Sequence, residues 1–182
     1  MAIFELPAVI DRLRARSTPD GPTDIANAAV ATVLRAGGDG AESLLIQRAH
    51  RVGDPWSGHM AFPGGKREPT DLTSRDTAVR ETHEEVGLHL SPSAFVARLD
   101  DVTAPARDFR VAHFVFALEG PESPLVTSAE VAATLWVPIR LFARPSLSGQ
   151  EIPHRLQLGD VVVWGMTYRM MQHVLDAVQA DR

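Results

Sequence analysis

One segment, residues 64–88 with the sequence GGKREPTDLTSRDTAVRETHEEVGL, constrains this chain more than any other. Two glycines and a polar loop lead into a helical pattern, and Gly87 is a typical helix stop. Side chains three and four positions apart are neighbours on a helix, so Glu81, Glu84 and Glu85 share one face. Carboxylates at this spacing repel each other by roughly a few tenths of a kcal/mol per pair, which a helix with no other purpose would avoid.

The helix, expected over residues 74–86, divides into two faces. Ser74 and Thr77 fall on the side of the three glutamates, while Val79 and Val86 fall opposite and are expected to face the core. Hard divalent cations prefer oxygen ligands, so a bound metal would convert the repulsion into coordination. A solvated acidic surface is the commoner meaning of the bare pattern, and this alternative stays open.

The residues around the glutamates favour the metal site. Gly64 and Gly65 lack side chains, so their backbone can approach closely and a carbonyl there can become a further ligand. Arg80 can reach Glu84 at a spacing of four and hold it in place. The segment is therefore interpreted as a metal site built for phosphate chemistry.

Composition limits the class of protein. The 182 residues fit a single domain over residues 1–182, and 45% apolar residues allow a sizeable core. A net charge of −5 argues against binding nucleic acid through a broad basic surface, although a few arginines can still hold a small anion.

The absence of cysteine excludes disulfides and zinc-thiolate sites. With no signal peptide and no apolar run long enough to span a bilayer, we expect a soluble, cytoplasmic protein without a membrane partner.

Strand and helix patterns alternate irregularly, which predicts an α/β fold with a mixed sheet packed between helices. Turns are expected at two glycine clusters, residues 37–40 and 63–65. The expected helices cover residues 4–16, 74–86 and 166–180, with a short helix from Pro138. The expected strands cover residues 26–34, 43–47, 59–62, 94–99, 111–118, 131–137 and 160–164.

Residues 80–88, RETHEEVGL, resemble the second half of the Nudix hydrolase box at every charged and glycine position. Asp71 stands at the first acidic position of that box, and the loop from it to Arg80 is one residue longer than the family pattern. The resemblance implies a Nudix-like α/β/α sandwich that cleaves nucleoside diphosphates linked to another moiety. It also implies a magnesium or manganese ion held by Glu81, Glu84, Glu85 and the Gly65 carbonyl.

The resemblance further implies a set of catalytic residues. This catalytic set consists of Arg80 and the three glutamates Glu81, Glu84 and Glu85. A further carboxylate often deprotonates the attacking water in this family, at a position that varies, and Glu81 and Glu130 are the candidates. An ordinary loop charge remains the alternative for Glu130.

The segment before the box narrows the choice of substrate. Residues 44–49, LLIQRA, and residues 62–65, FPGG, resemble the region preceding the box in coenzyme A pyrophosphatases of the Nudix group. This implies a nucleotide substrate, coenzyme A or an acyl-CoA, cleaved to 3′,5′-ADP and 4′-phosphopantetheine or its acyl form. Arg48 and Arg51 are the hypothetical phosphate contacts, with surface charge as the alternative.

Gly64 and Gly65 complete the expected substrate-binding set, and Trp56 is expected either to form part of a wall or to anchor its loop. Two other functions stay open. One is a pyrophosphatase for ADP-ribose, NADH or dinucleoside polyphosphates, and the other is a non-catalytic nucleotide sensor, against which the complete charged helix argues. A homodimer is also left open.

Several conspicuous residues are assigned no site role. Trp136 and Trp164 occupy apolar strand patterns and are expected in the core. Arg107, Asp108 and Arg110 are expected to form a charged loop before a strand, which either lines the pocket or is simply solvated.

Overall fold

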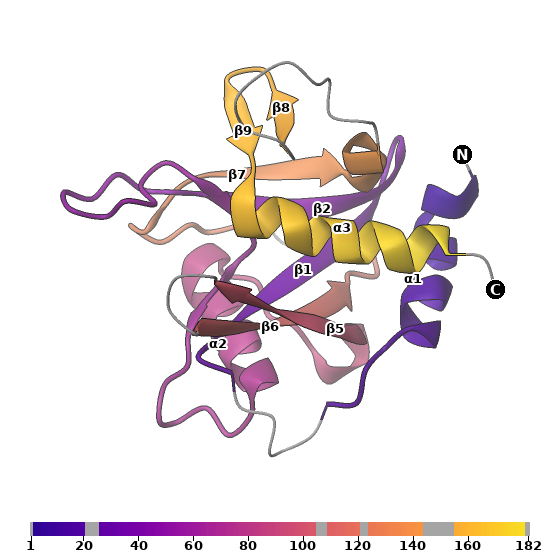
Figure 1. Cartoon of the computed structure of the whole chain (residues 1–182), viewed down its shortest axis with the longest axis horizontal. Helices are drawn as coiled ribbons and strands as arrows, with labels where there is room; N and C mark the ends of the chain where they lie inside the picture. Colours follow the sequence, from indigo (N-terminus) through magenta and orange to yellow (C-terminus); the bar gives the residue numbers. More distant parts are fainter. Residues whose placement is uncertain (1, 21–25, 105–108, 121–123, 144–154, 181–182) are drawn as a thin grey trace.

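A computed structural model of the protein describes residues 2–20, 26–104, 109–120, 124–143 and 155–180 (Figure 1). The α-helices are α1 (Leu6–Ala15), α2 (Ser74–Val86) and α3 (Gly165–Gln179), and the 3-10 helices are η1 (Ala2–Phe4), η2 (Pro92–Ala94) and η3 (Ile139–Ala143). The strands are β1 (Ala28–Gly37), β2 (Gly40–Arg48), β3 (Met60–Ala61), β4 (Gly64–Lys66), β5 (Phe95–Ala104), β6 (Phe109–Ala117), β7 (Val131–Pro138), β8 (Leu156–Leu158) and β9 (Val161–Val163).

Most of the strands form one mixed sheet around β1. Strand β6 runs parallel to β1, while β2 runs antiparallel and joins it through a hairpin that turns between Gly37 and Gly40. The order across the sheet is β3-β2-β1-β6-β5, with β4 also pairing with β1 and β7 with β2. Strands β8 and β9 form a separate two-stranded hairpin.

Helices cover both faces of the sheet, because successive side chains of β1 point to opposite sides and both sides are apolar. Ala29, Ala31 and Val33 pack in a cluster with residues of α2. Ala28 and Leu34 pack in a second cluster with residues of α1 and α3. Figure 1 shows α3 crossing in front of the strands and α2 on their far side. The predicted α/β sandwich with a mixed sheet is confirmed.

The helix boundaries follow the sequence pattern closely. Helix α2 spans the expected residues, and Gly87 ends it at φ 70°. Helix α1 begins at Leu6, because the chain before it forms the 3-10 helix η1. Helix α3 begins and ends one residue earlier than expected. Among the described residues, no helix combines the length and apolarity that crossing a membrane requires.

The expected turn at residues 63–65 is wrong, since Gly64 and Gly65 belong to β4 and pair with the start of β1. Gly64 has φ 151°, and a Cβ there would lie 2.3 Å from the Ala29 carbonyl oxygen, so a side chain cannot fit this close pairing. A strand of three residues, two of them glycine, has no apolar pattern. Only the pairing with β1 reveals it.

The expected burial of Trp164 is also wrong, since this residue is 40% exposed. Strand β9 ends at Val163 and lies outside the main sheet, so Trp164 sits at the start of α3, with its ring centre 5.0 Å from that of His59. Trp136 in β7 is partly buried, and the Arg35 guanidinium lies 4.1 Å from its ring centre. Trp136 therefore packs at the margin of the core.

The expected charged loop is only partly described. Arg107 and Asp108 lie outside the described residues. Arg110 belongs to β6 and forms an ion pair with Asp101 at 3.3 Å. Arg110 is therefore a strand residue and not part of a loop.

Candidate active site

Local contacts fix both ends of α2. The Thr73 hydroxyl accepts a hydrogen bond from the Asp76 N–H at 3.1 Å, and the Asp76 carboxylate accepts one from the Thr73 N–H at 2.8 Å. At the other end Gly87 adopts the left-handed conformation that commonly closes a helix. The last turns between these caps carry Glu81, Glu84 and Glu85, called the carboxylate cluster below.

The two faces of α2 are not divided as expected. Ser74 and Thr77, expected beside the glutamates, are buried, and Glu85 is buried with them at 6% exposure. Val86 is buried as predicted, whereas Val79 is only partly buried. The buried face therefore mixes polar and apolar groups, and the expected clean division is wrong.

Strand β4 brings its two glycines against this face. The Gly64 N–H donates to Glu85 Oε2 at 2.9 Å. At Gly65 an added Cβ would lie 2.4 Å from both Cδ and Oε1 of Glu81, so the Glu81 carboxylate fills the space that a side chain would need. Gly64 and Gly65 therefore lie against two of the three glutamates.

Arg80 joins the acidic groups to one another. Its Nη1 donates to Glu81 Oε1 at 3.1 Å and to Glu84 Oε2 at 3.0 Å, and the second contact is the one that the spacing predicts. Its Nε and Nη2 donate to the two carboxylate oxygens of Asp71 at 3.0 and 2.9 Å. Nη2 also donates to the Lys66 carbonyl at 3.1 Å. One guanidinium therefore fixes β4, the loop before α2 and two glutamates relative to each other.

Asp71 is a partner that sequence reasoning marked only as the first acidic position of the box. It is 4% exposed and accepts hydrogen bonds from the Glu68 N–H and the Thr77 hydroxyl, both at 2.9 Å. The hydrogen bonds from Arg80, and then those from Glu68 and Thr77, lower the pKa of Asp71 to about 2. Asp71 therefore stays ionised and anchors Arg80.

Burial dominates the electrostatics of the carboxylate cluster. It raises the pKa of Glu85 to about 8, and the Glu81 and Glu130 charges add to the rise while the Gly64 N–H and Arg48 oppose it. Burial also raises the pKa of Glu81, against the neighbouring Arg80. Carboxylates that are costly to ionise where they lie would be stabilised in their ionised form by a nearby cation.

The segment that leads into β7 forms a neighbouring wall. The Ser128 N–H donates to the Glu85 carbonyl at 3.0 Å, and the Ala49 N–H donates to the Glu130 carbonyl at 2.8 Å. Glu130 lies close enough for its charge to raise the pKa of both Glu81 and Glu85. Sequence spacing did not require this approach, which depends on contacts between distant parts of the chain.

Arg48 and Arg51 lie beside this wall, and each is paired with a carboxylate. Arg48 Nη2 contacts Asp54 Oδ2 at 2.9 Å. The Arg48 charge also acts to lower the pKa of Glu85, against the effect of burial. Arg51 Nη2 contacts Glu130 Oε1 at 2.8 Å. The structure therefore brings both predicted arginines near the carboxylate cluster, but with protein groups as their partners.

The loop over residues 49–59 carries Arg51 and the predicted wall residue Trp56. Figure 1 shows it extending from the sheet beside the segment that leads into β7. Trp56 is 51% exposed, and Val52 near the loop tip is fully exposed. Arg48 Nε, at the base of the loop, is buried and has no hydrogen-bond partner among the described residues, which leaves a donor for water or a bound anion.

The oxygen atoms gathered here suit a hard divalent cation. They belong to the carboxylates of Glu81, Glu84 and Glu85 and to the Gly65 backbone. In the described conformation Arg80 bonds to Glu81 and Glu84, and no three acidic or imidazole side chains in the described ranges form a ready ligand shell. The residues therefore fit a metal by their chemistry, although their side chains would have to rearrange to surround it.

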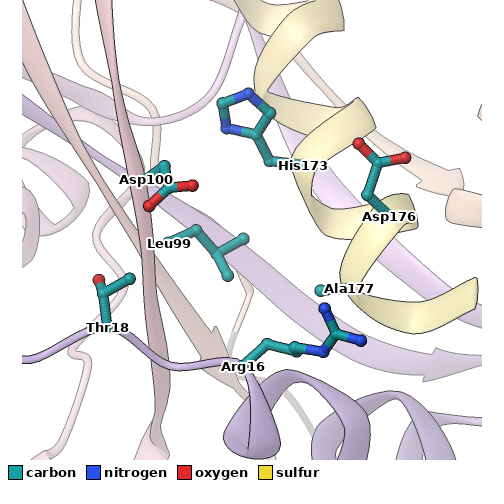
Figure 2. Close-up of a pocket in the computed structure, with 7 residues that line it drawn as sticks. All are labelled: Arg16, Thr18, Leu99, Asp100, His173, Asp176 and Ala177. Atoms are coloured by element: carbon teal, nitrogen blue, oxygen red, sulfur yellow. The ribbon is translucent and has the colours of Figure 1, made fainter. Parts of the chain in front are cut away.

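A separate pocket of about 210 Å³ lies on the other side of the sheet, where α1, β5 and α3 meet (Figure 2). It is lined by Arg16, Thr18, Leu99, Asp100, His173, Asp176 and Ala177. None of these residues belongs to α2, to β4, to β2 with Arg48 or to the loop with Arg51. The carboxylate cluster and this pocket are therefore distinct.

Comparison with known proteins identifies the family. The sequence model of the NUDIX domain matches residues 26–155, a range that includes α2, β4, both arginines and Glu130. The chain belongs to the NUDIX family. The predicted resemblance is thereby confirmed, and Nudix hydrolases generally use divalent metal ions.

Two curated relatives match part of the Nudix chain. An uncharacterised protein of Schizosaccharomyces pombe is 43% identical over 103 residues, which are 53% of this chain and 31% of the relative. The peroxisomal coenzyme A diphosphatase NUDT7 of Mus musculus is 34% identical over 94 residues, which are 52% of this chain and 39% of the relative. The chain therefore spans less than half the length of either protein.

Solved structures support the fold. The crystal structure of a NUDIX hydrolase from Alicyclobacillus acidocaldarius superposes with a TM-score of 0.61, over 87% of this chain and 94% of that one. The two sequences are 22% identical. The likeness therefore concerns the architecture and carries no statement about substrate.

Proposed function

We propose that this protein hydrolyses the diphosphate linkage of a nucleotide derivative, with coenzyme A or an acyl-CoA as the first candidate. The products would be 3′,5′-ADP and 4′-phosphopantetheine or its acyl form. The observation that carries the proposal is the meeting of Glu81 and Glu85 with the glycines of β4, organised by Arg80. The similarity to a relative named as a coenzyme A diphosphatase supports the choice of substrate.

In this proposal Glu81, Glu84, Glu85 and the Gly65 carbonyl hold a magnesium or manganese ion. When bound, such an ion neutralises the diphosphate and lowers the pKa of the attacking water. Arg80 touches protein groups and acts as a positioning residue. It holds two of the glutamates in place relative to β4. Such positioning matters because hydrolysis of a diphosphate depends mainly on positioning and charge stabilisation.

Glu130 is the stronger of the two candidates for the general base. Glu81 is held by Arg80 and packs against Gly65, whereas the Glu130 side chain is 57% exposed and lies within electrostatic reach of the cluster. An exposed carboxylate with room to move can take a proton from a water bound beside the cluster. Arg48 and Arg51 would contact the substrate phosphates, and Trp56 would form part of the wall.

A product-resolved substrate screen tests the proposal. Coenzyme A, acetyl-CoA, ADP-ribose, NADH and a dinucleoside polyphosphate are incubated separately with the protein and Mg²⁺ or Mn²⁺, and the products are separated by chromatography. Release of 3′,5′-ADP and 4′-phosphopantetheine as the preferred reaction supports the proposal. A preference for ADP-ribose, NADH or the polyphosphate would contradict coenzyme A as the substrate and support the alternative pyrophosphatase. Binding of a nucleotide without turnover would contradict the proposed hydrolysis and support a non-catalytic sensor.

The Glu84→Gln, Glu85→Gln double variant is the matched control for the screen. It keeps the shape of both side chains and removes both charges, so turnover should be abolished while the folded state survives. Circular dichroism checks the fold of the variant. Undiminished cleavage by a folded double variant would contradict the assigned role of the cluster.

Some expectations stay predictions within this proposal. They are the single domain over residues 1–182, the cytoplasmic location and the absence of nucleic-acid and membrane partners. A homodimer also remains open. Sedimentation at several protein concentrations decides the oligomeric state.

A further inference from the structure

We infer that Glu130 occupies the position on Arg51 that a substrate phosphate takes, so that substrate binding displaces Glu130 and frees it beside the carboxylate cluster. The inference rests on the proposed diphosphate hydrolysis and adds a coupling between substrate binding and the release of the base. It assigns Arg51 two successive anionic partners.

The pair that must open is exposed and accessible. Arg51 Nη2 and Glu130 Oε1 are 2.8 Å apart, and the two side chains are 54% and 57% exposed. Ion pairs in such surroundings are weak, because water competes for both charges. A phosphate offers more charge and more oxygen acceptors to a guanidinium than one carboxylate does. A diphosphate bound at the cluster can therefore replace Glu130 on Arg51.

The backbone of Arg51 is held while its side chain is free to change partner. The Arg51 N–H donates to the Ser57 hydroxyl at 2.9 Å, and that hydroxyl donates to the Arg51 carbonyl at 3.0 Å. The Asp54 N–H donates to the same carbonyl at 3.1 Å. These hydrogen bonds hold the loop backbone at Arg51, so the guanidinium can change its partner without movement of the loop.

The backbone of Glu130 is held as well. Its carbonyl accepts from the Ala49 N–H at 2.8 Å, and two residues earlier the Ser128 N–H donates to the Glu85 carbonyl at 3.0 Å. Once released by Arg51, the Glu130 side chain can turn about this fixed point. The Glu130 carboxylate already lies close enough for its charge to raise the pKa of Glu81 and of Glu85.

The neighbouring pair shows why the exchange is assigned to Arg51 and not to Arg48. Asp54, the partner of Arg48, is 16% exposed, and its second oxygen accepts from the Trp56 N–H at 3.0 Å. Asp54 is therefore built into the loop. Among the described residues, only Arg51 bonds to the Glu130 carboxylate, so Glu130 can move away without breaking a second side-chain bond.

The released carboxylate completes the proposed reaction. The oxygen of the attacking water forms a bond to phosphorus, and its proton passes to Glu130. The bond from phosphorus to the bridging oxygen breaks, and that oxygen leaves with the bonding electron pair. The base is thus free only when a phosphate has taken its place on Arg51.

Binding of inorganic pyrophosphate in the presence of Mg²⁺, measured by calorimetry, tests the exchange. The probe contains only the group that all candidate substrates share and needs no turnover. Glu130→Gln removes the competing charge and should tighten binding about two- to fivefold, the range expected for loss of a weak surface pair. Arg51→Ala should weaken binding by a similar factor, and adding Glu130→Gln to Arg51→Ala should give no tightening.

An exposed pair remote from the site provides the control. Arg140 Nη2 contacts Asp39 Oδ2 at 2.6 Å. Asp39 immediately precedes β2, about 30 Å along the strand direction from Arg48 at its other end. Asp39→Asn should leave pyrophosphate binding unchanged. Equal tightening in Asp39→Asn would mean a general charge effect and would overturn the exchange.

Steady-state kinetics separate this inference from the proposed function. With the substrate that the screen selects, Glu130→Gln should lower both KM and kcat, while Arg51→Ala should raise KM. A folded wild-type protein that binds no pyrophosphate, or tightening by Glu130→Gln that persists without Arg51, overturns the exchange. Cleavage of none of the substrates, with the expected binding cycle intact, overturns the proposed function alone.

Discussion

Gly65 leaves no room for a side chain on the side that meets α2. Its backbone lies against the Glu81 carboxylate, at a distance that only a glycine permits. The obstacle is the far end of a flexible side chain, so the fold can adapt by moving Glu81. The position of Glu81, and not the stability of the sheet, is what Gly65 determines.

Gly65→Ala should therefore reduce activity far more than stability. Displacing a group that positions the reaction by about 1 Å costs on the order of 100-fold in rate. The measurement is kcat together with the urea midpoint. Gly38→Ala is the control, because an added Cβ there meets nothing within 4 Å. Wild-type kcat in Gly65→Ala would show that the placement of Glu81 is unimportant.

Arg80→Lys should lower kcat/KM and Mn²⁺ affinity by roughly 10- to 100-fold, as changes to residues that orient metal ligands typically do. An ammonium group cannot reproduce the fork that holds Asp71 and two glutamates at once. Manganese affinity is measured by electron paramagnetic resonance.

Arg75→Ala on the same helix is the control for this change. Arg75 pairs with Asp20 at 3.4 Å and touches none of the glutamates in the described contacts. Equal losses in the two variants would assign the effect to the stability of α2 and not to the orientation of the cluster.

At the scale of elements, α2 was predictable because its signals are local. Thr73 and Asp76 form the capping box, and Gly87 ends the helix with a positive φ. The strands β4 and β8 lacked such signals, because three residues carry too little alternation to predict a strand. Their existence depends on pairing partners elsewhere in the chain.

Thr73→Ala should lower the free energy of unfolding by about 1 kcal/mol, because the hydrogen bond from the Asp76 N–H to the Thr73 hydroxyl is lost. Urea denaturation measures the difference. Thr70→Ala, in the exposed loop just before the helix, should have little effect. Equal destabilisation by the two changes would mean that the cap is not the cause.

For the whole molecule, a buried histidine in the core opposes folding in acid. His113 is fully buried on β6, and its Nε2 lies 2.7 Å from the Thr32 hydroxyl on β1. Burial, with a smaller contribution from His173, lowers the pKa of His113 to about 3. The folded protein therefore keeps this ring neutral at pH values where the unfolded chain protonates it.

The sign of the pH effect follows from this difference. As the pH falls below about 6.5, the unfolded state gains a proton at His113 and the folded state does not, so the free energy of unfolding decreases. Between about pH 7.5 and pH 5 the contribution is about 2 kcal/mol. Between pH 7.5 and pH 5, urea unfolding should show a decrease in the free energy of unfolding that is about 2 kcal/mol larger for wild type than for His113→Gln. Parallel profiles of the two proteins against pH would contradict this assignment.

The amino-acid sequence alone determined α2, its three glutamates, the contact from Arg80 to Glu84 and the Nudix family, because these depend on spacing within one helix and on a local motif. Tertiary structure decided the rest. It buried Glu85 and Asp71, turned a presumed glycine turn into β4, exposed Trp164 and brought Glu130 to the cluster and to Arg51. Burial and contact between segments far apart in the chain arise from packing around the sheet, which no local spacing encodes.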